Sequence, residues 1–256
     1  MKEIIHSIKD GFWNAYREYE TFRPPDSDFP TKITEYLFTV NVARALNEQF
    51  PRKGSCGIFV EYPYLQFLQL AKSKYITENI LKMEKDVTRK ERNKYRNKSR
   101  IDIVFQGRAI GPQYTEDVSN FAIELKGINP PSNKVKADLE RLKYALLVKN
   151  KEGKNYISQC YCAYLKRIDS MKKVYDGKDK TREVEKYNKK LDEILKILFK
   201  GSKIDYKIKI KDFDATELKD YLSGYPEEDL SEEGAKGKTG CIMSVIISLK
   251  KADERP

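Results

Sequence analysis

Two short apolar segments of this chain each carry a carboxylate, and the second also carries a lysine. Asp102 lies within residues 100–105, and Glu124 and Lys126 lie within residues 121–126. Branched and aromatic residues in runs of this length predict buried strands. Because an unpaired ionised side chain costs several kcal/mol to bury, we expect a cation, a hydrogen-bond network or a metal ion beside these acids.

The alternation of side chains along a strand puts Glu124 and Lys126 on one face and Leu125 on the other. Two acids and a lysine suit Mg²⁺ (or Mn²⁺), because Mg²⁺ prefers a few carboxylate oxygens and keeps several waters. Such a site leaves positions for a phosphate and for a water nucleophile. Lys126 could orient that water or offset charge on the phosphate. These residues therefore predict a metal site suited to phosphodiester hydrolysis.

Histidine and cysteine usage excludes several other chemistries. The single histidine, His6, lies near the start of the chain in a predicted amphipathic helix, so neither a Ser-His-Asp triad nor a His-rich zinc site is expected. We interpret His6 as a surface residue. The four cysteines contain no Cys-x-x-Cys pair. Cys160 and Cys162 share one face of a predicted strand, so reduced, buried thiols are the favoured interpretation.

Charge favours a polyanionic partner. The 256 residues include 50 Lys and Arg against 39 Asp and Glu, for a net charge of +11. Nucleic acid is the leading candidate, although solvated lysines also explain many basic chains. The first residues lack the apolar core of a secretion signal, and no apolar run approaches the length that spans a bilayer. We therefore expect a cytoplasmic protein without a membrane partner.

Hydrophobic spacing predicts an α/β chain with one domain over residues 1–256. Helices are expected over residues 3–20, 32–48, 133–149 and 181–199. Strands are expected over residues 58–62, 100–105, 121–126, 156–165, 203–211 and 241–249. The helix over 133–149 should bury Val135, Leu139, Leu142 and Leu146, whereas the acidic segment 226–240 is expected to be a loop.

The order helix, strand, strand, strand, helix, strand, with an acid on the second strand and Glu-x-Lys on the third, resembles the PD-(D/E)xK nuclease superfamily. The resemblance covers about residues 31–165 and implies a central mixed β-sheet flanked by helices, in a restriction-endonuclease-like core. To that core this chain adds a basic insertion at about 72–100 and a C-terminal elaboration at about 170–256 with extra strands. It departs from the pattern at Ile101, where proline would precede the acid, and in the length of the insertion.

This resemblance implies a metal-dependent nuclease site at one edge of the sheet. Asp102 matches the first metal-binding acid, Glu124 and Lys126 match the Glu-x-Lys pair, and the Leu125 carbonyl would be a further metal ligand. Glu35, near the start of the helix before the sheet, matches a glutamate that many members place there. Three simpler interpretations stay open: Glu124 and Lys126 as an exposed ion pair on an edge strand, Asp102 paired with Arg100, and Glu35 offsetting the helix dipole.

Basic residues of the insertion and of the following helix are candidate phosphate contacts. They are Arg89, Lys90, Arg92, Lys94, Arg96, Lys98, Lys134 and Arg141. Each neutralised phosphate would add to the salt dependence of binding. The insertion could equally be solvated. On the helix, Lys134, Asp138 and Arg141 could contact phosphate or brace Lys126, or could form a solvent-exposed charge set.

The sequence thus predicts a metal-dependent nuclease with DNA, rather than RNA, as the favoured candidate substrate, in restriction, repair or defence against foreign genomes. A homodimer would suit cleavage of both strands of a duplex. The alternative is a catalytically inactive nucleic-acid-binding or assembly subunit with the same fold. The intact set of Asp102, Glu124 and Lys126 favours the enzyme.

Overall fold

The computed structural model describes residues 2–22, 35–50, 57–72, 99–108, 118–168, 177–212 and 241–252. In chain order its elements are α1 (Lys2–Phe22), α2 (Glu35–Gln49), β1 (Gly57–Pro63), α3 (Tyr64–Lys72), β2 (Arg100–Arg108), β3 (Val118–Ile128), α6 (Ser132–Leu147), β4 (Ile157–Ile168), α7 (Gly177–Phe199), β5 (Ile204–Asp212) and β6 (Cys241–Lys251). All the strands expected from the sequence are present, with ends that differ by a few residues.

The strands form one mixed sheet in the order β1-β2-β3-β4-β6-β5. β3 and β4 are parallel, and the other neighbouring pairs are antiparallel. The last strand, β6, is therefore inserted between β4 and β5. The sheet confirms the predicted α/β class with a central mixed sheet flanked by helices.

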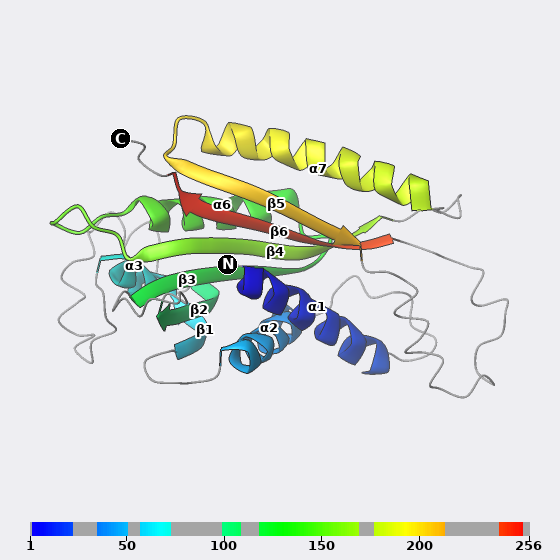
Figure 1. Cartoon of the computed structure of the whole chain (residues 1–256), viewed down its shortest axis with the longest axis horizontal. Helices are drawn as coiled ribbons and strands as arrows, with labels where there is room; N and C mark the ends of the chain where they lie inside the picture. The colour runs from blue at the N-terminus through cyan, green and yellow to red at the C-terminus, as the bar shows by residue number, and fades with distance from the viewer. Residues whose placement is uncertain are drawn as a thin grey trace.

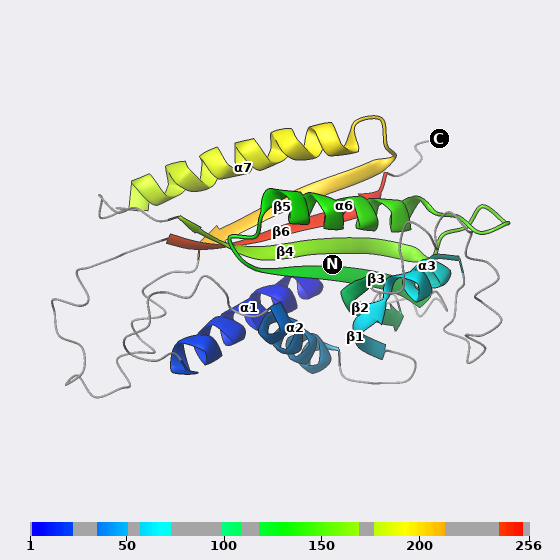
Figure 2. The same ribbon diagram turned by 180° about the vertical axis from the view of Figure 1, so that it is seen from behind.

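Helices cover both faces of the sheet, and each face has its own hydrophobic core. α1 and α2 lie on one side, while α6 and α7 lie on the other (Figures 1 and 2). The first core joins α1 and α2 to Ile103, Ile123 and Leu125. The second joins α3, α6 and α7 to Val104 and Ala122. Successive residues of β2 and β3 thus alternate between two buried faces, as a central strand of a three-layer fold requires.

α1 is amphipathic and packs closely on α2. Ile5, Ile8 and Phe12 are buried, whereas the His6 side chain is 71% exposed and lies 3.4 Å from Asp10, which confirms it as a surface residue. At the crossing, a Cβ on Gly11 would lie 2.4 Å from the Val42 backbone. Only glycine fits this approach, because real Cβ atoms need more room.

α6 buries the face that its spacing predicts. Val135, Leu139, Leu142 and Leu146 are all buried in the core that α6 shares with the sheet. The helix begins directly after Pro130 and Pro131, which end the preceding segment. α6 follows β3 closely, so it lies over the part of the sheet that carries Glu124 and Lys126.

One helix, α3, was not expected from the sequence, and two expected segments lie outside the described residues. α3 was not predicted, although its polar residues Gln66, Gln69 and Lys72 recur at every third position. Its apolar residues are buried: Tyr64, Phe67, Leu68, Leu70 and Ala71. Most of the basic insertion, residues 73–98, lies outside the described residues, as does the expected loop 226–240.

Candidate functional site

β2 and β3 separate at the point where they carry their acids. Their pairing runs from Arg108 and Val118 to Ile103 and Ile123 and stops there. β2 nevertheless continues along β1 as far as Arg100, and β3 continues along β4 as far as Ile128. The two strands therefore diverge at Asp102 and Glu124. Backbone groups that a continuous ladder would pair need other partners there.

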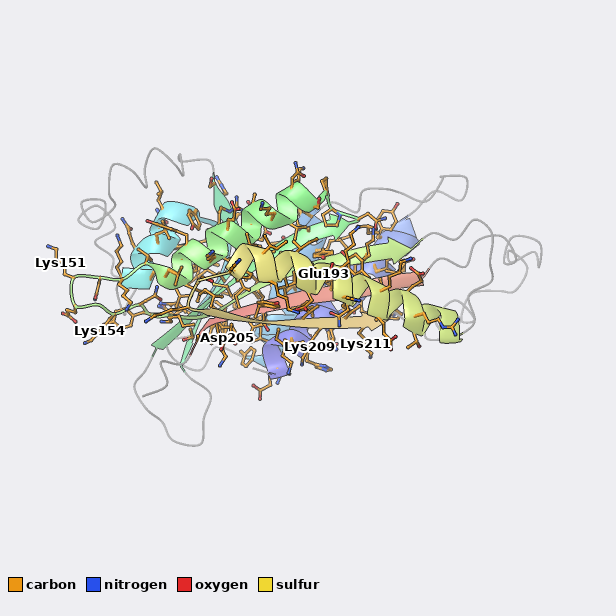
Figure 3. The ribbon with its side chains drawn as sticks, turned by 90° about the horizontal axis from the view of Figure 1, so that it is seen from above. Lys151, Lys154, Glu193, Asp205, Lys209 and Lys211 are labelled. Atoms are coloured by element: carbon orange, nitrogen blue, oxygen red, sulfur yellow. The ribbon has the colours of Figure 1, made fainter. Side chains whose placement is uncertain are left out.

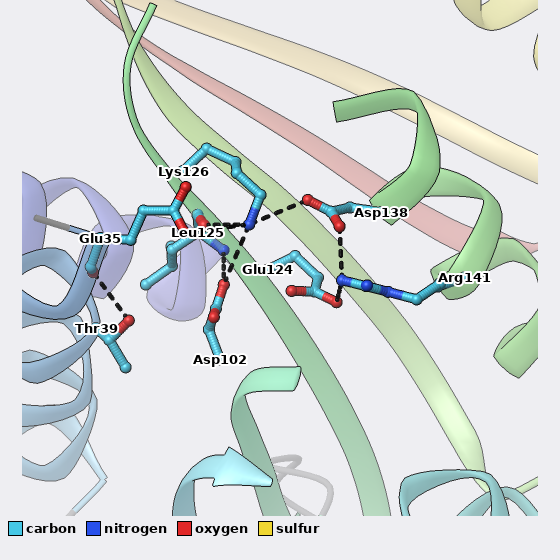
Figure 4. A network of polar contacts seen from close by, with 8 residues as sticks. All are labelled: Glu35, Thr39, Asp102, Glu124, Leu125, Lys126, Asp138 and Arg141. Carbon is cyan, nitrogen blue, oxygen red and sulfur yellow. Dashed lines mark hydrogen bonds and ion pairs between the residues drawn. The ribbon is translucent and has the colours of Figure 1, made fainter. Parts of the chain in front are cut away.

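The Asp102 carboxylate occupies this opening and replaces part of the ladder. Its Oδ2 accepts a hydrogen bond of 2.6 Å from the backbone N–H of Leu125 (Figure 4). Asp102 thereby links the two strands where their backbones no longer pair. The same oxygen lies 4.0 Å from the ammonium group of Lys126.

Lys126 lies at the centre of a network of charged residues drawn from β2, β3, α2 and α6 (Figure 4). Its Nζ is 3.1 Å from Asp138 Oδ2 and 3.7 Å from Glu35 Oε2, and it donates a hydrogen bond of 3.0 Å to the Leu125 carbonyl. The Lys126 side chain is 10% exposed, so these contacts form mostly out of solvent. Asp138 Oδ2 accepts no well-aligned hydrogen bond, so its contact with Lys126 is an ion pair.

Arg141 holds the other carboxylate of β3. One guanidinium nitrogen, Nη2, donates to Glu124 Oε1 at 2.7 Å and to Asp138 Oδ1 at 2.6 Å. The Glu124 side chain is 1% exposed, so it depends on this partner for much of its compensation. The hydroxyl of Tyr64 donates to the backbone carbonyl of Arg141 at 2.7 Å and ties α3 to this turn of α6.

Burial shifts the ionisation of both strand acids. Burial raises the pKa of Asp102 to about 6, although Lys126 and the Leu125 amide act in the opposite direction. Burial and then the neighbouring Asp102 charge raise the pKa of Glu124 well above its usual value, against the effect of Arg141. Burial alone would lower the pKa of Lys126, but the surrounding carboxylates raise it. The site therefore favours a charged lysine and disfavours the simultaneous ionisation of both strand acids.

The structure brings all the predicted catalytic and metal-binding residues into one network. Asp102, Glu124, the Leu125 carbonyl, Lys126 and Glu35 all take part in its contacts. Of the predicted phosphate contacts, Arg141 lies in the network and faces carboxylates, whereas Lys134 is exposed on α6 and makes no ion pair in the described residues. The others lie outside the described residues: Arg89, Lys90, Arg92, Lys94, Arg96 and Lys98.

The simpler interpretations fare differently. An exposed ion pair on an edge strand is wrong for Glu124 and Lys126, because β3 is an interior strand and both side chains are buried. Asp102 pairs with the Leu125 amide and Lys126, and no ion pair joins it to Arg100 within the described residues. Glu35 is the first residue of α2, so it can offset the helix dipole as well as contact Lys126.

Of the residues in the network, Asp138 is the one whose role the sequence indicated most weakly. A charged residue on a helix beside Lys134 and Arg141 is usually solvated, yet Asp138 is 4% exposed. Of the three roles that the sequence left open for this set, the bracing of Lys126 is the one observed for Asp138. The sequence did contain one signal for this role, which is charge complementarity. The helix carries an acid and an arginine three residues apart, and the strand carries a glutamate and a lysine two residues apart.

The two cysteines of β4 are buried and free, as predicted. Cys162 lies opposite Glu124 in the β3–β4 register. Burial, and then the Asp138 and Glu124 charges, raise the pKa of its thiol well above its usual value. Both thiols therefore serve as small apolar residues of the core.

No group of three or more His, Cys, Asp or Glu side chains in the described part of the chain is arranged to hold a metal ion. Glu35 is separated from the other acids by Lys126, and Asp138 faces Arg141 and Lys126. The donors that remain together are the carboxylates of Asp102 and Glu124 and the carbonyl of Leu125. A site on these atoms would contain two carboxylates and one backbone oxygen.

Comparisons of this chain with protein-family models, with curated proteins and with solved structures find no match. Among the helices of the described segments, none combines the length and the apolar character needed to cross a membrane.

Proposed function

We propose that this protein is a metal-dependent nuclease that hydrolyses phosphodiester bonds, with DNA as the first substrate class. The observation that supports this most is the convergence of Asp102, Glu124 and Lys126 at the divergence of β2 and β3. On the same grounds we assign a restriction-endonuclease-like core to β1–β4 with α2 and α6. Element order and the Glu-x-Lys spacing support that assignment.

The charge of the network favours a divalent cation. Four carboxylates, Glu35, Asp102, Glu124 and Asp138, surround two cations, Lys126 and Arg141. Full ionisation would leave two negative charges in excess. Burial is the main cause of the raised pKa values of Asp102 and Glu124, and a bound cation would offset its cost. Oxygen donors from two carboxylates and a carbonyl suit Mg²⁺ or Mn²⁺, which would complete their coordination with water. When bound, such an ion supplies an activated water and neutralises charge on the phosphate.

Each residue of the network would have a separate role in the reaction. Asp102 and Glu124 provide the oxygen ligands, and the Leu125 carbonyl becomes available if Lys126 turns toward substrate. Lys126 stays charged in this environment, so it can donate to a phosphate oxygen and offset charge that develops there. Asp138 and Glu35 limit where its ammonium can lie. Arg141 holds Glu124 in position from the α6 side.

One observation favours an inactive nucleic-acid-binding or assembly subunit instead. Arg141 and Lys126 already compensate the buried acids within the protein, so the network can hold the fold together without a metal ion. In such a subunit these ion pairs would be purely structural. The two candidates differ in one accessible property, which is whether Mg²⁺ or Mn²⁺ binds to the folded protein.

Two measurements test the proposal. Linear and circular DNA and RNA are incubated with the protein in Mg²⁺, in Mn²⁺ or in chelator, and we expect cleavage that requires the metal. Thermal unfolding in the same ions should shift upward, because a ligand that binds only the folded state stabilises it by mass action. Glu124→Gln and Lys126→Ala should abolish cleavage, whereas Glu152→Gln, at an exposed acid of a turn, should cleave as wild type.

The outcomes separate the two candidates. Metal-dependent cleavage that Glu124→Gln removes supports the nuclease. A protein that binds nucleic acid but neither cleaves it nor gains stability from either ion would support the inactive subunit. Equal cleavage by Glu124→Gln and wild type would exclude this site.

A further inference from the structure

β5 presents apolar side chains to one face of the sheet and lysines to the other. Tyr206, Ile208 and Ile210 pack into the core beneath α7. The residues that alternate with them, Lys207, Lys209 and Lys211, must point the opposite way. Lys209 lies directly across from Ile246 of β6, which packs in the core under α1. The three lysines therefore line the α1 side of the sheet, along its outer strand.

Lys9 of α1 approaches this row from the neighbouring helix. Burial, and then the ammonium groups of Lys211 and Lys209, lower the pKa of Lys9, while Asp10 has a weaker opposite effect. Like charges shift one another's ionisation only when they lie close together. Figure 3 shows Lys209 and Lys211 following each other along β5, beside α1. We call Lys9, Lys207, Lys209 and Lys211 the lysine patch.

Two described acids adjoin the patch along the chain, and each has a partner outside it. Asp10 lies 3.4 Å from His6, and Asp205, at the start of β5, lies 3.9 Å from Lys250. Within the described residues, no member of the lysine patch has a carboxylate at ion-pair distance. Lys207 and Lys211 are exposed, and Lys9 and Lys209 are partly exposed. The patch is therefore a concentration of positive charge with no ion-paired carboxylate among the described residues.

Protection of an open sheet edge explains only part of this arrangement. Lysines on an outer strand hinder edge-to-edge association with other chains, and β5 is such a strand. Lys9, however, belongs to a helix that forms no part of the edge. Its approach to Lys209 and Lys211 costs repulsion and adds nothing to edge protection. A partner with dense negative charge accounts for all four residues.

We propose that the lysine patch binds the phosphate backbone of a nucleic acid. The identity of this polyanion rests on the proposed nuclease function, whereas the need for an anionic partner follows from the charge of the patch. Alternate residues of a strand are about 6.8 Å apart, so the β5 lysines form an evenly spaced row of ammonium groups facing a repeating anion. Such contacts position a nucleic acid without reading its sequence.

The position of the patch relates it to the candidate active site. β5 runs in the same direction as β3 and β4, since β6 is antiparallel to both β4 and β5. The register places Leu125, Ala163, Ile246 and Lys209 in one row across the sheet. Three strand spacings separate the ends of that row, or about 14 Å. Leu125 and the patch lie on the α1 side of the sheet, whereas Glu124 and Lys126 contact α6 on the other side. A nucleic acid that contacts both regions must therefore pass around this end of the sheet.

The test measures binding of a fluorescent 30-base-pair DNA duplex to the full chain by anisotropy, in chelator so that metal-dependent cleavage cannot occur. The variant Lys207→Gln/Lys209→Gln/Lys211→Gln is compared with Lys189→Gln/Lys190→Gln/Lys200→Gln, which removes the same charge from exposed positions on α7 and its end. Because each phosphate contact contributes a slope of about 0.9, the plot of log affinity against log salt should become shallower by about 2 to 3 for the β5 variant. Its affinity should fall at least about tenfold, and the α7 variant should stay within about twofold of wild type. Thermal unfolding of both variants checks that they fold.

The outcomes distinguish this inference from the proposed nuclease. If the β5 variant binds like the α7 variant while the wild type cleaves DNA, the docking surface is wrong and the nuclease stands. If wild type binds through the β5 lysines but cleaves nothing, the docking surface stands and the nuclease fails. Selective binding to polyglutamate or to anionic vesicles, with no binding to the duplex, would overturn the nucleic-acid partner.

Discussion

The charged network around Lys126 and the lysine patch on β5 place the same residue types in opposite surroundings. Around Lys126, buried acids and bases of both signs contact one another at 2.6–4.0 Å. Along β5, only positive charges are present: the lysines lie at the surface without ion pairs among the described residues. In the buried network each charge depends on its neighbours, whereas at the surface water supports each charge separately.

This contrast teaches that charge count alone does not indicate a role. The network's charges are part of what holds β2, β3, α2 and α6 together, so changes there should affect stability, function or both. The lysine patch contributes little to the fold, so changes there should affect partners alone. Substitutions in each region test whether the network stabilises the fold and whether the lysine patch does not.

Removing Arg141 should have the largest effect on stability. Arg141→Met leaves the buried Glu124 and Asp138 carboxylates without their shared guanidinium. Breaking a buried pair by removing one partner costs about 3–5 kcal/mol, and we expect a loss in that range by urea unfolding. The double variant Arg141→Met/Glu124→Gln should recover part of the loss, because the uncompensated charge is gone. A double variant no more stable than Arg141→Met would show that the Arg141–Glu124 contact is not a coupled ion pair.

Asp102 should make stability fall as pH rises through mildly acidic values. Its pKa is about 6 in the folded protein against about 3.9 in the unfolded chain, so the folded state keeps a proton that the unfolded state releases. The free energy of unfolding should therefore decrease between pH 4 and pH 6, by about 3 kcal/mol from this group, and level off above.

The measurement for Asp102 is urea unfolding in chelator from pH 4 to pH 7. The stability of Asp102→Asn relative to wild type should rise across this range, because asparagine carries no titrating proton. Asp205→Asn, at a surface acid whose side chain is 54% exposed, serves as the matched control and should show little such trend. A constant difference between Asp102→Asn and wild type would contradict the raised pKa.

Glu35 should separate stability from activity. Its side chain is 50% exposed and lies 3.7 Å from Lys126 Nζ, a distance at which an exposed pair contributes at most about 1 kcal/mol. Glu35→Gln should therefore unfold close to wild type in urea, while metal-dependent cleavage falls by about 10-fold to 100-fold if Glu35 helps to orient Lys126. Glu48→Gln, near the exposed end of the same helix, is the control. Unchanged cleavage would restrict Glu35 to offsetting the helix dipole.

The lysine patch should affect stability least. Lys207→Gln, Lys209→Gln and Lys211→Gln should each change the free energy of unfolding by no more than about 0.5 kcal/mol, as surface substitutions usually do. At low salt their combination should be slightly stabilising, because repulsion with Lys9 is relieved, and the gain should disappear at high salt. Urea unfolding at both ionic strengths measures this. A large loss would mean that these lysines belong to the fold after all.

The elements of the site could be predicted because local patterns determine them. Strand alternation correctly put Glu124 and Lys126 on one face, and helical spacing correctly identified the buried face of α6. Those patterns arise within a single segment, from the difference between the two sides of one strand or one helix. The predicted convergence of Asp102 with Glu124 and Lys126 required the resemblance in element order as well.

What could not be predicted depends on contacts between distant segments. Asp138 is buried because Lys126 and Arg141 compensate it, and its own helix face would otherwise expose it. Arg141 was expected to meet phosphate and instead contacts Glu124, which lies 17 residues earlier. The approach of Lys9 to β5 likewise depends on the strand order, which no single segment determines.

The internal position of β6 has a consequence for the order of folding. β5 has β6 as its sheet neighbour, and β4 is covered on that side by the same strand, yet β6 is the last strand of the chain. While the chain is being synthesised, the edge of β4 stays open and β5 lacks its sheet neighbour until residues 241–251 emerge, although α7 already has contacts to β4 and α6 through Tyr187 and Leu198. Long-range pairing of this kind is slow, because the chain loses the entropy of loop closure before any stabilising contact forms. We therefore expect a nascent state with a four-stranded sheet and an unpaired β5, in which apolar residues of both are exposed to chaperones or to other nascent chains.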